Sequence, residues 1–219
     1  MDAHIQYFHP ERMLLVDYNA RSNNYLFRSD SPLTKDFSSI AADEIYSRMV
    51  ELAMEQKIEF PDDFLVFDVC LLNLQKSDDR RSVEIEQEFT QDNPVVFDLW
   101  TIYGEELGPD SIRNVTERND MIATFDKWST DQLPELVELL YEFIHTKFDK
   151  SIVYIVHCME GVDRTGEVIG AYEVTYKNMT FDQVVAQDTK INGGKDAPKQ
   201  HNKNALKWYW EFLNYNKNC

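Results

Sequence analysis

The chain has 219 residues, 43% of them hydrophobic, so it is long enough to bury a full core. Its formal net charge of −17 disfavours docking on nucleic acid or on an anionic membrane, because both repel an acidic protein at long range. Only seven glycines and seven prolines occur, and we find no linker, low-complexity segment or repeat. We therefore expect a single domain over residues 1–219.

The predicted elements alternate between helices and strands. In chain order they are a helix (37–56), a strand (64–74), an exposed charged loop (78–92), a strand (95–103), an amphipathic helix (132–147), a strand (151–156), a helix (165–177), a helix from Thr180 to Ile191 and, after Gly193 and Gly194, a last helix (203–215). This order predicts an α/β fold, in which helices flank a central, mostly parallel twisted sheet.

The most informative segment is His157–Gly166, with the sequence HCMEGVDRTG, which we call the signature loop. It lies between the strand 151–156 and the helix 165–177, and five residues separate Cys158 from Arg164. A loop that enters a helix N-terminus can direct backbone N–H groups and the positive end of the helix dipole at an anion. The segment therefore predicts an anion cradle around a nucleophilic sulfur.

Each fixed residue of the loop has an expected role. Arg164 offers a planar fork for two phosphoryl oxygens, and the same positive field favours a Cys158 thiolate near neutral pH. His157 can hold the loop around the sulfur by hydrogen bonding, and Thr165 can donate a hydrogen bond to the sulfur when it leaves. The positions expected to line the phosphate, with Gly161 supplying a positive φ, are Met159, Glu160, Gly161, Val162, Asp163 and Arg164.

The loop resembles the signature His-Cys-x-x-Gly-x-x-Arg-Ser/Thr of the cysteine-dependent phosphatases, the protein tyrosine and dual-specificity superfamily, at every fixed position. The resemblance implies a two-step reaction through a cysteinyl-phosphate at Cys158, with a carboxylic acid that protonates the leaving oxygen and then activates water. It implies no metal and no cofactor. The segment NYLFRSDSP is similar to a Tyr/Phe-Arg-Ser-x-x-Pro segment of compact members, matching Arg28 and Ser29; the alternative is an ordinary turn before a helix.

The acid is expected upstream of the cysteine. Asp126 lies 32 residues before Cys158 and Asp131 lies 27 residues before it. Because Asp131 directly precedes a predicted helix, where aspartate suits the N-cap or first turn, we expect Asp126 to be the acid and keep Asp131 as the alternative, with Asp120 third. The Trp-Pro-Asp triplet of the family is missing, and Asp126 could instead be a solvated loop carboxylate.

The charges of the loop bear on the substrate. Asp163 before Arg164 is similar to the Asp-Arg-Thr loops of the myotubularin and Sac lipid phosphatases, yet this loop has no lysine. We therefore expect a phosphotyrosine, phosphoserine or phosphothreonine protein or a small phosphomonoester as substrate. The alternatives are a phosphoinositide or inositol phosphate, and a phosphate-binding module without catalysis. A membrane lipid is not favoured, but a local basic patch could bind one through Lys190, Lys195, Lys199, His201 and Lys203.

The cysteines and the hydropathy bear on location. Three irregularly spaced cysteines suit neither a disulfide framework nor a metal cluster, and a reactive thiolate needs a reducing compartment, so we expect a cytoplasmic protein. No apolar run is long enough for a transmembrane helix, and no signal peptide is recognisable. Cys70 is expected to be a buried core residue, with a resolving role toward oxidised Cys158 as the alternative.

Overall fold

The structure is a computed structural model that describes residues 6–217. Its contacts group the chain into two compact units. The first unit comprises Met1–Ile102 and Glu142–Gly161, and the second comprises Tyr103–Tyr141 and Val162–Cys219. The chain passes from one unit to the other within the signature loop, after Gly161. That the whole chain is one domain stays a prediction.

The first unit is built on a five-stranded sheet with the order β1-β2-β5-β3-β4. Its strands are β1 (Leu14–Asn19), β2 (Asn24–Ser29), β3 (Phe64–Cys70), β4 (Val95–Leu99) and β5 (Ser151–His157), preceded by a short 3-10 helix, η1 (Pro10–Arg12). Strand β1 runs antiparallel to β2, and the other neighbouring pairs are parallel. The mostly parallel sheet of the predicted α/β class is therefore confirmed, and β5, which leads into the signature loop, lies at its centre.

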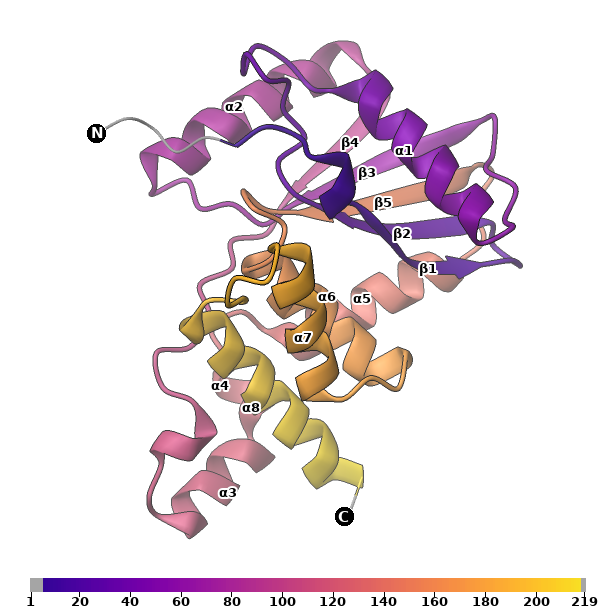
Figure 1. The fold of residues 1–219 in the computed structure, drawn as a ribbon. Helices are drawn as coiled ribbons and strands as arrows, with labels where there is room; N and C mark the ends of the chain where they lie inside the picture. The colour runs from indigo at the N-terminus through magenta and orange to yellow at the C-terminus, as the bar shows by residue number, and fades with distance from the viewer. Residues whose placement is uncertain (1–5, 218–219) are drawn as a thin grey trace. The chain divides into compact units, whose positions relative to one another are not determined.

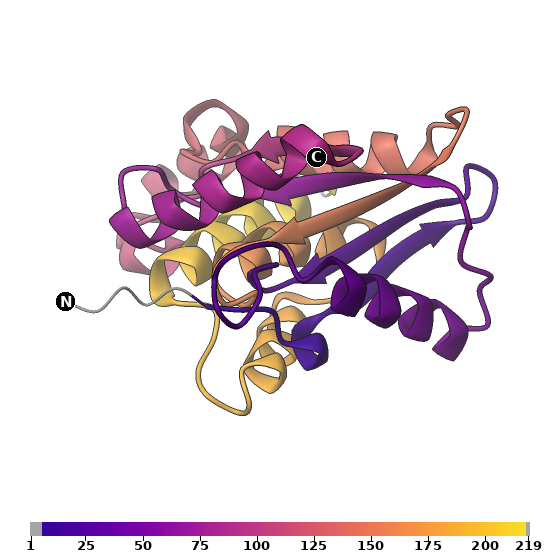
Figure 2. The same cartoon turned by 90° about the horizontal axis from the view of Figure 1, so that it is seen from above.

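Helices cover both faces of this sheet. Helix α1 (Ala42–Glu55) and helix α2 (Ser77–Asp92) lie over the same face (Figure 1), α1 toward the β1 edge and α2 toward the β4 edge (Figure 2). On the opposite face, Phe143 near the end of α5 (Leu133–His145) stacks on Tyr154 of β5, with ring centroids 5.5 Å apart. The helical flanks expected from the sequence are thus present within the first unit.

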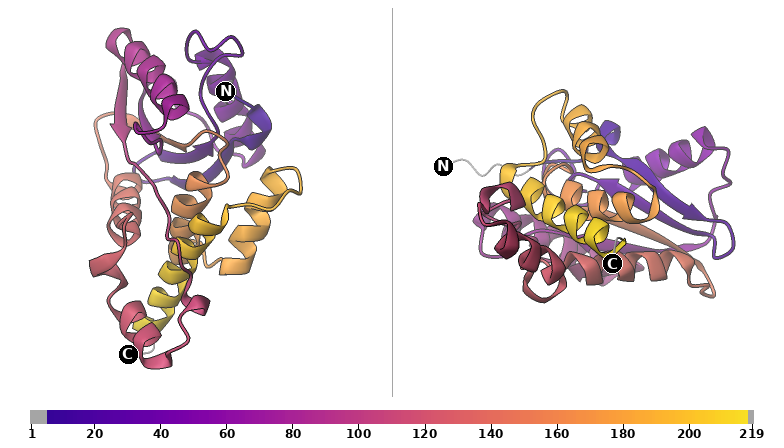
Figure 3. Two further views of the ribbon diagram at one scale, coloured as in Figure 1. Left: turned by 90° about the vertical axis from the view of Figure 1, so that its left-hand side faces the viewer. Right: turned by 90° about the horizontal axis from the view of Figure 1, so that it is seen from below.

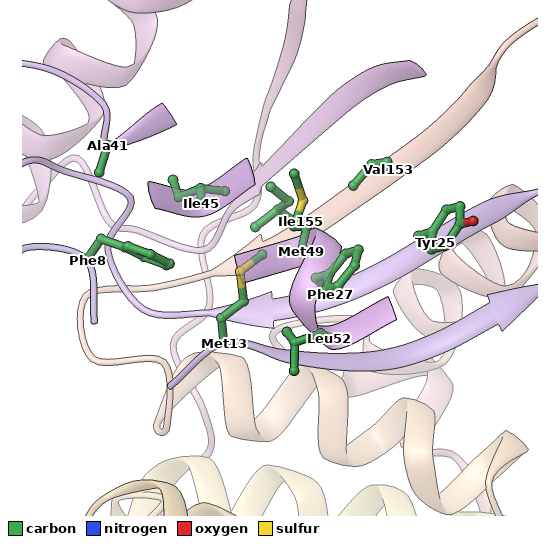
Figure 4. Packing of buried hydrophobic residues seen from close by; sticks show 10 residues of the cluster. All are labelled: Phe8, Met13, Tyr25, Phe27, Ala41, Ile45, Met49, Leu52, Val153 and Ile155. Carbon is green, nitrogen blue, oxygen red and sulfur yellow. The ribbon is translucent and has the colours of Figure 1, made fainter. Parts of the chain in front are cut away.

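The core of the first unit lies between α1 and the sheet (Figure 4). The α1 side chains Ile45, Met49 and Leu52 pack against Phe27 of β2 and Ile155 of β5. Burying side chains of this size stabilises a fold by about 1.5–3 kcal/mol each. The packing holds β2 and β5 in register, with Ser29 opposite His157, at the start of the signature loop.

Helix α2 corrects the sequence analysis, because the loop predicted over 78–92 is wrong. Its buried face carries Asp79, Ser82 and Glu86 beside the apolar Val83 and Ile85. These polar groups have partners in the unit, such as the backbone N–H of Asn73, which donates to Asp79 over 2.9 Å. A helix whose inner face is polar shows little hydrophobic periodicity, so the pattern favoured an exposed loop.

The other elements of the first unit differ from the prediction mainly at their ends. The strand predicted over 64–74 ends at Cys70, the one predicted over 95–103 ends at Leu99, and the helix predicted from residue 37 begins at Ala42. Strands β1 and β2 were not predicted. Strand β2 contains Arg28 and Ser29, which therefore lie in the sheet beside β5 and not in a turn.

The second unit, taken by itself, is helical. It contains η2 (Pro109–Ser111), α3 (Val115–Ala123), α4 (Phe125–Trp128), the first part of α5, α6 (Arg164–Tyr176), α7 (Phe181–Ile191) and α8 (Gln200–Lys217). Helix α8 contacts both α6 and α3 along its length (Figure 3), and α7 packs on α6. Thr180 and Gln183 form the capping box that begins α7, as the sequence predicts for Thr180. Within residues 6–217, no helix is both long enough and apolar enough to cross a membrane.

Candidate active site

Cys158 directly follows the last residue of the central strand. His157 ends β5 and pairs in register with Cys70 at the end of β3. The carboxyl end of parallel strands is where ligands bind in open α/β sheets. Cys158 is 1% exposed, so its sulfur lies inside the fold and not on an open surface.

Residues near the N-terminus, between positions 12 and 31, donate hydrogen bonds to the first half of the signature loop. Three consecutive carbonyl oxygens, which a free loop would expose to water, each accept a hydrogen bond from a residue between positions 12 and 31. The bonds run from the Ser31 N–H to Met159 (3.3 Å), from Arg12 Nη1 to Glu160 (2.8 Å) and from Arg28 Nη2 to Gly161 (2.8 Å).

These bonds orient the peptide groups of the loop. In a planar trans peptide the N–H points away from the C=O of the same group. The donors that bind the carbonyl oxygens of Met159 and Glu160 therefore turn the N–H groups of Glu160 and Gly161 toward the opposite side. Successive N–H groups facing one side form the kind of concavity that binds an anion.

Gly161 is required for this path. Its φ is +71°, in the left-handed region. A Cβ atom at this position would lie 2.8 Å from both the backbone nitrogen of Asp30 and the carbonyl oxygen of Ser29. The loop therefore needs glycine both for its backbone conformation and for its close approach to the end of β2.

The second half of the signature loop begins a helix. Arg164 is the first residue of α6 and Thr165, which is buried, is the second. Asp163 occupies the N-cap position, and its carboxylate binds Lys199 twice, through the backbone N–H (2.8 Å) and through Nζ (2.7 Å). The aspartate of the loop thus ties one lysine of the predicted basic patch to the start of α6. Lys203, another member of that patch, pairs with Asp196.

His157 lies in a buried network of ionisable groups within the first unit. Its Nε2 is 2.8 Å from Oδ1 of Asp68 and 3.5 Å from Oε2 of Glu86. Burial acts against a charged imidazole, but the two carboxyl groups outweigh it and raise the pKa of His157 to about 9. Burial raises the pKa of Glu86, which also has the Cys70 thiol as a neighbour.

Among residues 6–217, the same network contains the only group of three potential metal ligands whose ligand atoms lie close together. Atoms of Cys70, Glu86 and His157 lie within 4.8 Å of one another, and all three residues are buried. Nε2 of His157 is, however, already paired with Asp68, which gives the imidazole a partner without a metal. We therefore describe the cluster as an ion-pair network.

The two candidate acids have different environments in the second unit. Asp126 is exposed in the short helix α4. Asp131 is buried, and its carboxylate accepts hydrogen bonds from the backbone N–H groups of Tyr103 (2.9 Å) and Gly104 (2.6 Å). Burial raises the pKa of Asp131. Asp131 therefore fixes the chain at residues 103–104, whereas Asp126 faces solvent.

A buried acid that the sequence pattern did not indicate lies close to Arg164 in the chain. Glu167, one turn into α6, is fully buried, and its Oε2 accepts a hydrogen bond from Asn202 Nδ2 over 2.7 Å. Burial, together with the negative charge of Asp131, raises the pKa of Glu167 well above its usual range. The available signal was an acidic residue in the run TGEVIGAY, whose other residues are small, apolar or aromatic.

An apolar cavity of about 340 Å³ lies elsewhere in the first unit, between α1 and strands β3 and β4. Ile45, Met49, Phe64 and Val66 line it, and the charged groups in its wall are Asp43 and Asp68. No residue of the signature loop lines this cavity. The cavity is relevant to the site because Asp68 lines it. The side chain of Asp68 is 13% exposed.

Comparisons with known proteins add a likeness at the level of the fold. No family model matches the chain, and no curated protein matches its sequence. Among solved structures the chain is similar to kinase associated phosphatase with its catalytic-site cysteine replaced by serine, at 11% identity, a TM-score of 0.45 and coverage of 100% of this chain and 96% of that one. It is also similar to a protein tyrosine phosphatase of Trypanosoma brucei, at 13% identity, a TM-score of 0.31 and coverage of 92% and 71%. At these values neither structure assigns an activity or a residue role to this chain.

Proposed function

We propose that this chain is a cysteine-dependent phosphatase that hydrolyses phosphomonoesters through a cysteinyl-phosphate intermediate. The observation that carries the proposal is a set of three hydrogen bonds, donated by residues between positions 12 and 31. They are accepted by the three consecutive carbonyl oxygens that directly follow Cys158. This set supports a cradle of backbone N–H groups next to the sulfur. The chain order supports the rest, because Arg164 opens a helix of 13 residues six positions after Cys158.

In the first step the Cys158 thiolate attacks phosphorus. The S–P bond forms as the bond from phosphorus to the leaving oxygen breaks, and a carboxylic acid gives that oxygen a proton. The fork of Arg164 and the backbone N–H groups of the loop bind the phosphoryl oxygens, whose charge is redistributed in the transition state. Met159, Glu160, Gly161, Val162 and Asp163 contribute through their backbone.

In the second step water attacks the cysteinyl-phosphate. The carboxylate that lost its proton accepts one from the water, and the S–P bond breaks to release phosphate and the thiolate. We propose Asp126 as this acid and base, since a solvent-facing carboxyl can exchange its proton, and Asp131 is held by two backbone N–H groups. Thr165 stabilises the departing sulfur, and His157 holds the start of the loop.

The favoured substrates are proteins that carry phosphotyrosine, phosphoserine or phosphothreonine, or small phosphomonoesters. The signature loop contains no lysine, and the net charge of −17 opposes approach to an anionic lipid surface. The chemistry needs no metal and no cofactor. Because a thiolate nucleophile is inactivated by oxidation, we propose a reducing compartment, the cytoplasm, as the place of action.

One observation favours a second candidate, the phosphoinositides and inositol phosphates. Lys199 is bound to Asp163, the residue before Arg164, so a basic side chain is present at the start of α6. Asp163 neutralises it in the structure. Replacing Asp163 with Asn would leave the lysine charge without its carboxylate partner. We expect this variant to raise the ratio of two turnover rates, that of a bisphosphorylated inositol lipid to that of a monophosphorylated peptide, about fivefold. An unchanged ratio would remove the argument for this candidate.

The proposed function is tested by phosphate release from a panel of phosphotyrosine peptides, phosphothreonine peptides and phosphoinositides. We expect turnover by the wild type, none by Cys158→Ser, and a loss of orders of magnitude in Arg164→Lys, because a point charge cannot replace the bidentate fork. Substantial activity in Cys158→Ser would refute the nucleophile. Phosphate binding without turnover on any substrate would instead indicate a phosphate-binding module.

A further inference from the structure

We propose that the apolar cavity between α1 and strands β3 and β4 is a binding site for a small lipophilic ammonium ion, a molecule with a compact hydrocarbon body and a cationic nitrogen. The site is separate from the signature loop, because no residue of that loop lines the cavity. The inference therefore goes beyond the proposed function and does not depend on the phosphatase reaction.

Strand β3 is an inner strand of the sheet, yet one of its faces is incompletely covered. Inner strands of parallel sheets are usually buried on both faces, because helices pack on each side. Here α1 lies toward the β1 edge and α2 toward the β4 edge of the same face (Figure 1, Figure 2), which leaves β3 between the two helices. Phe64 and Val66, which both line the cavity, are only half-buried. The fold thus leaves an apolar floor that a further molecule can cover.

The size and the lining of the cavity suit a compact hydrocarbon body. Its volume is about 340 Å³, and the buried side chains of Ile45, Met49 and Ile155 form part of its wall (Figure 4). Ligand pockets usually span about 300–1,000 Å³. An apolar cavity of about 150 Å³ is already enough to bind benzene, so the volume found here suits a body of about two fused rings.

The charged groups in the wall of the cavity are both acidic. Asp43 is exposed in the first turn of α1, and Asp68 follows Val66 on the same face of β3. Among residues 6–217, no lysine, arginine or histidine lines the cavity. One oxygen of Asp68 is 2.8 Å from Nε2 of His157, but a carboxylate can accept about four hydrogen bonds and so keeps capacity for a ligand. A carboxylate or phosphate ligand would therefore be repelled, whereas an ammonium group can pair with either aspartate.

Aromatic side chains are a second feature that favours a cation. The rings of Tyr46 and Phe64, which both line the cavity, stack with centroids 6.1 Å apart, and Tyr46 is 45% exposed. The face of an aromatic ring attracts an ammonium ion within about 6 Å of its centre. Asp43 and Tyr46 are three residues apart in α1 and are therefore neighbours on the helix surface. The solvent side of the cavity thus offers both a carboxylate and a ring.

The unmodified protein provides the first test, with three probes that share one naphthyl body: naphthylethylammonium, naphthylethanol and naphthylpropanoate. Calorimetry at neutral pH measures their affinities, and the methyl NMR resonances of Ile45, Val66 and Ile155 locate the bound probe. We expect the ammonium probe to bind at least tenfold more tightly than the carboxylate probe, with the alcohol between them, and to shift these methyl resonances. Equal affinities of the three probes, no binding of the ammonium probe, or unshifted methyl resonances would overturn the proposal.

A larger side chain in the floor of the cavity provides the second test. Val66→Phe fills part of the space, and we expect it to weaken binding of the ammonium probe at least tenfold. Val96→Phe is the matched control: Val96 lies on the neighbouring strand β4, its side chain points to the opposite face from that of Val95, which lines the cavity, and it is 38% exposed. Equal losses of affinity in the two variants would place the probe outside this cavity. The measurements on the unmodified protein hold whether or not Val66→Phe folds.

A charge substitution at the solvent side tests the choice of a cation. We expect Asp43→Asn to weaken binding of the ammonium probe about threefold, the range of an exposed ion pair, and to leave the affinity for naphthylethanol unchanged. Glu44→Gln is the control, because Glu44 is the next exposed acid of α1 and does not line the cavity. An equal effect of Asp43→Asn on both probes, or an equal effect of the two substitutions on the ammonium probe, would contradict the pairing of the ligand with Asp43. Every readout is binding, so a protein without phosphatase activity tests this site equally well.

Discussion

The guanidinium of Arg28 donates a hydrogen bond to the carbonyl oxygen of Gly161 over 2.8 Å, joining strand β2 to the signature loop. Arg28 has no exposed surface, so its charge depends on partners inside the fold. A buried cation that binds a loop carbonyl fixes the orientation of that peptide group. The sequence segment NYLFRS thus has a specific structural role, which is to brace the loop that follows Cys158.

Arg28→Met keeps the apolar stem of the side chain and removes the donor. We expect the free energy of unfolding to fall by about 2 kcal/mol, the usual contribution of a buried hydrogen bond to a charged group. In a Cys158→Ser background we also expect inorganic phosphate to bind about tenfold more weakly, since the loop peptides lose their orientation. Arg81→Met, at an exposed position of α2, is the control and should change stability by no more than about 0.5 kcal/mol. Equal effects of the two substitutions on phosphate affinity would exclude the bracing role.

Gly161→Ala tests the close approach of the loop to β2. The added Cβ would be in the left-handed region and only 2.8 Å from backbone atoms of Ser29 and Asp30, so the loop must move. Gly193→Ala is a matched control: its φ is +65°, but a Cβ there meets nothing within 4 Å. We expect the control to lose about 1 kcal/mol of stability from backbone strain and to keep its affinity for phosphate. Gly161→Ala should lose clearly more stability and most of that affinity, as measured by calorimetry, and similar losses in both proteins would argue against a steric requirement.

The elements predicted correctly from the sequence are those whose buried side chains are apolar. Strand β5 is apolar throughout its middle, and α5 has a regular apolar face, so both appear in the hydrophobic pattern. Helix α2 does not, because its inner face bears Asp79 and Glu86, whose partners come from elsewhere in the fold. The residues that make α2 look solvent-exposed are thus the ones that place a carboxyl group beside His157.

The residues of the site show the same contrast between local sequence pattern and contacts made through the fold. The order of Cys158, Gly161 and Arg164 along the chain identifies the loop, because local spacing carries that information. Asp68 and Arg28 reach the loop only through the pairing of β3 and β2 with β5, and no local pattern specifies which strands are neighbours. For the same reason the two candidate acids could not be separated by spacing alone, whereas their environments in the structure differ.

The leaving group of the substrate distinguishes the two acids. If Asp126 protonates the leaving oxygen, Asp126→Asn should lower kcat about a hundredfold for phenyl phosphate and much less for a substrate whose leaving group needs no proton. Asp131→Asn should instead reduce stability, because two backbone N–H groups lose a charged acceptor, and should affect both substrates alike. The opposite pattern, with leaving-group dependence confined to Asp131→Asn, would transfer the role to Asp131.

The pair formed by Asp30 and His9 predicts a pH dependence of stability. Oδ2 of Asp30 is 2.7 Å from Nδ1 of His9, and burial outweighs this contact and raises the pKa of Asp30 to about 6 from 3.8. The folded state therefore binds a proton more tightly than the unfolded state. The resulting stabilisation is fully present below about pH 4 and is lost as pH rises through about 6.

Asp30→Asn removes this titration while keeping the size and hydrogen-bonding capacity of the side chain. We expect the stability of the wild type relative to the variant to fall by about 2–3 kcal/mol between pH 4 and pH 7, because a shift of one pKa unit corresponds to about 1.4 kcal/mol. Urea unfolding of both proteins across that range measures the difference, in which the titrations of other buried acids such as Glu86 cancel. A difference that stays constant with pH would show that Asp30 has the same affinity for a proton in the folded and unfolded chain. A difference that grows with pH would show that the His9 contact, and not burial, determines the charge of Asp30 next to the loop.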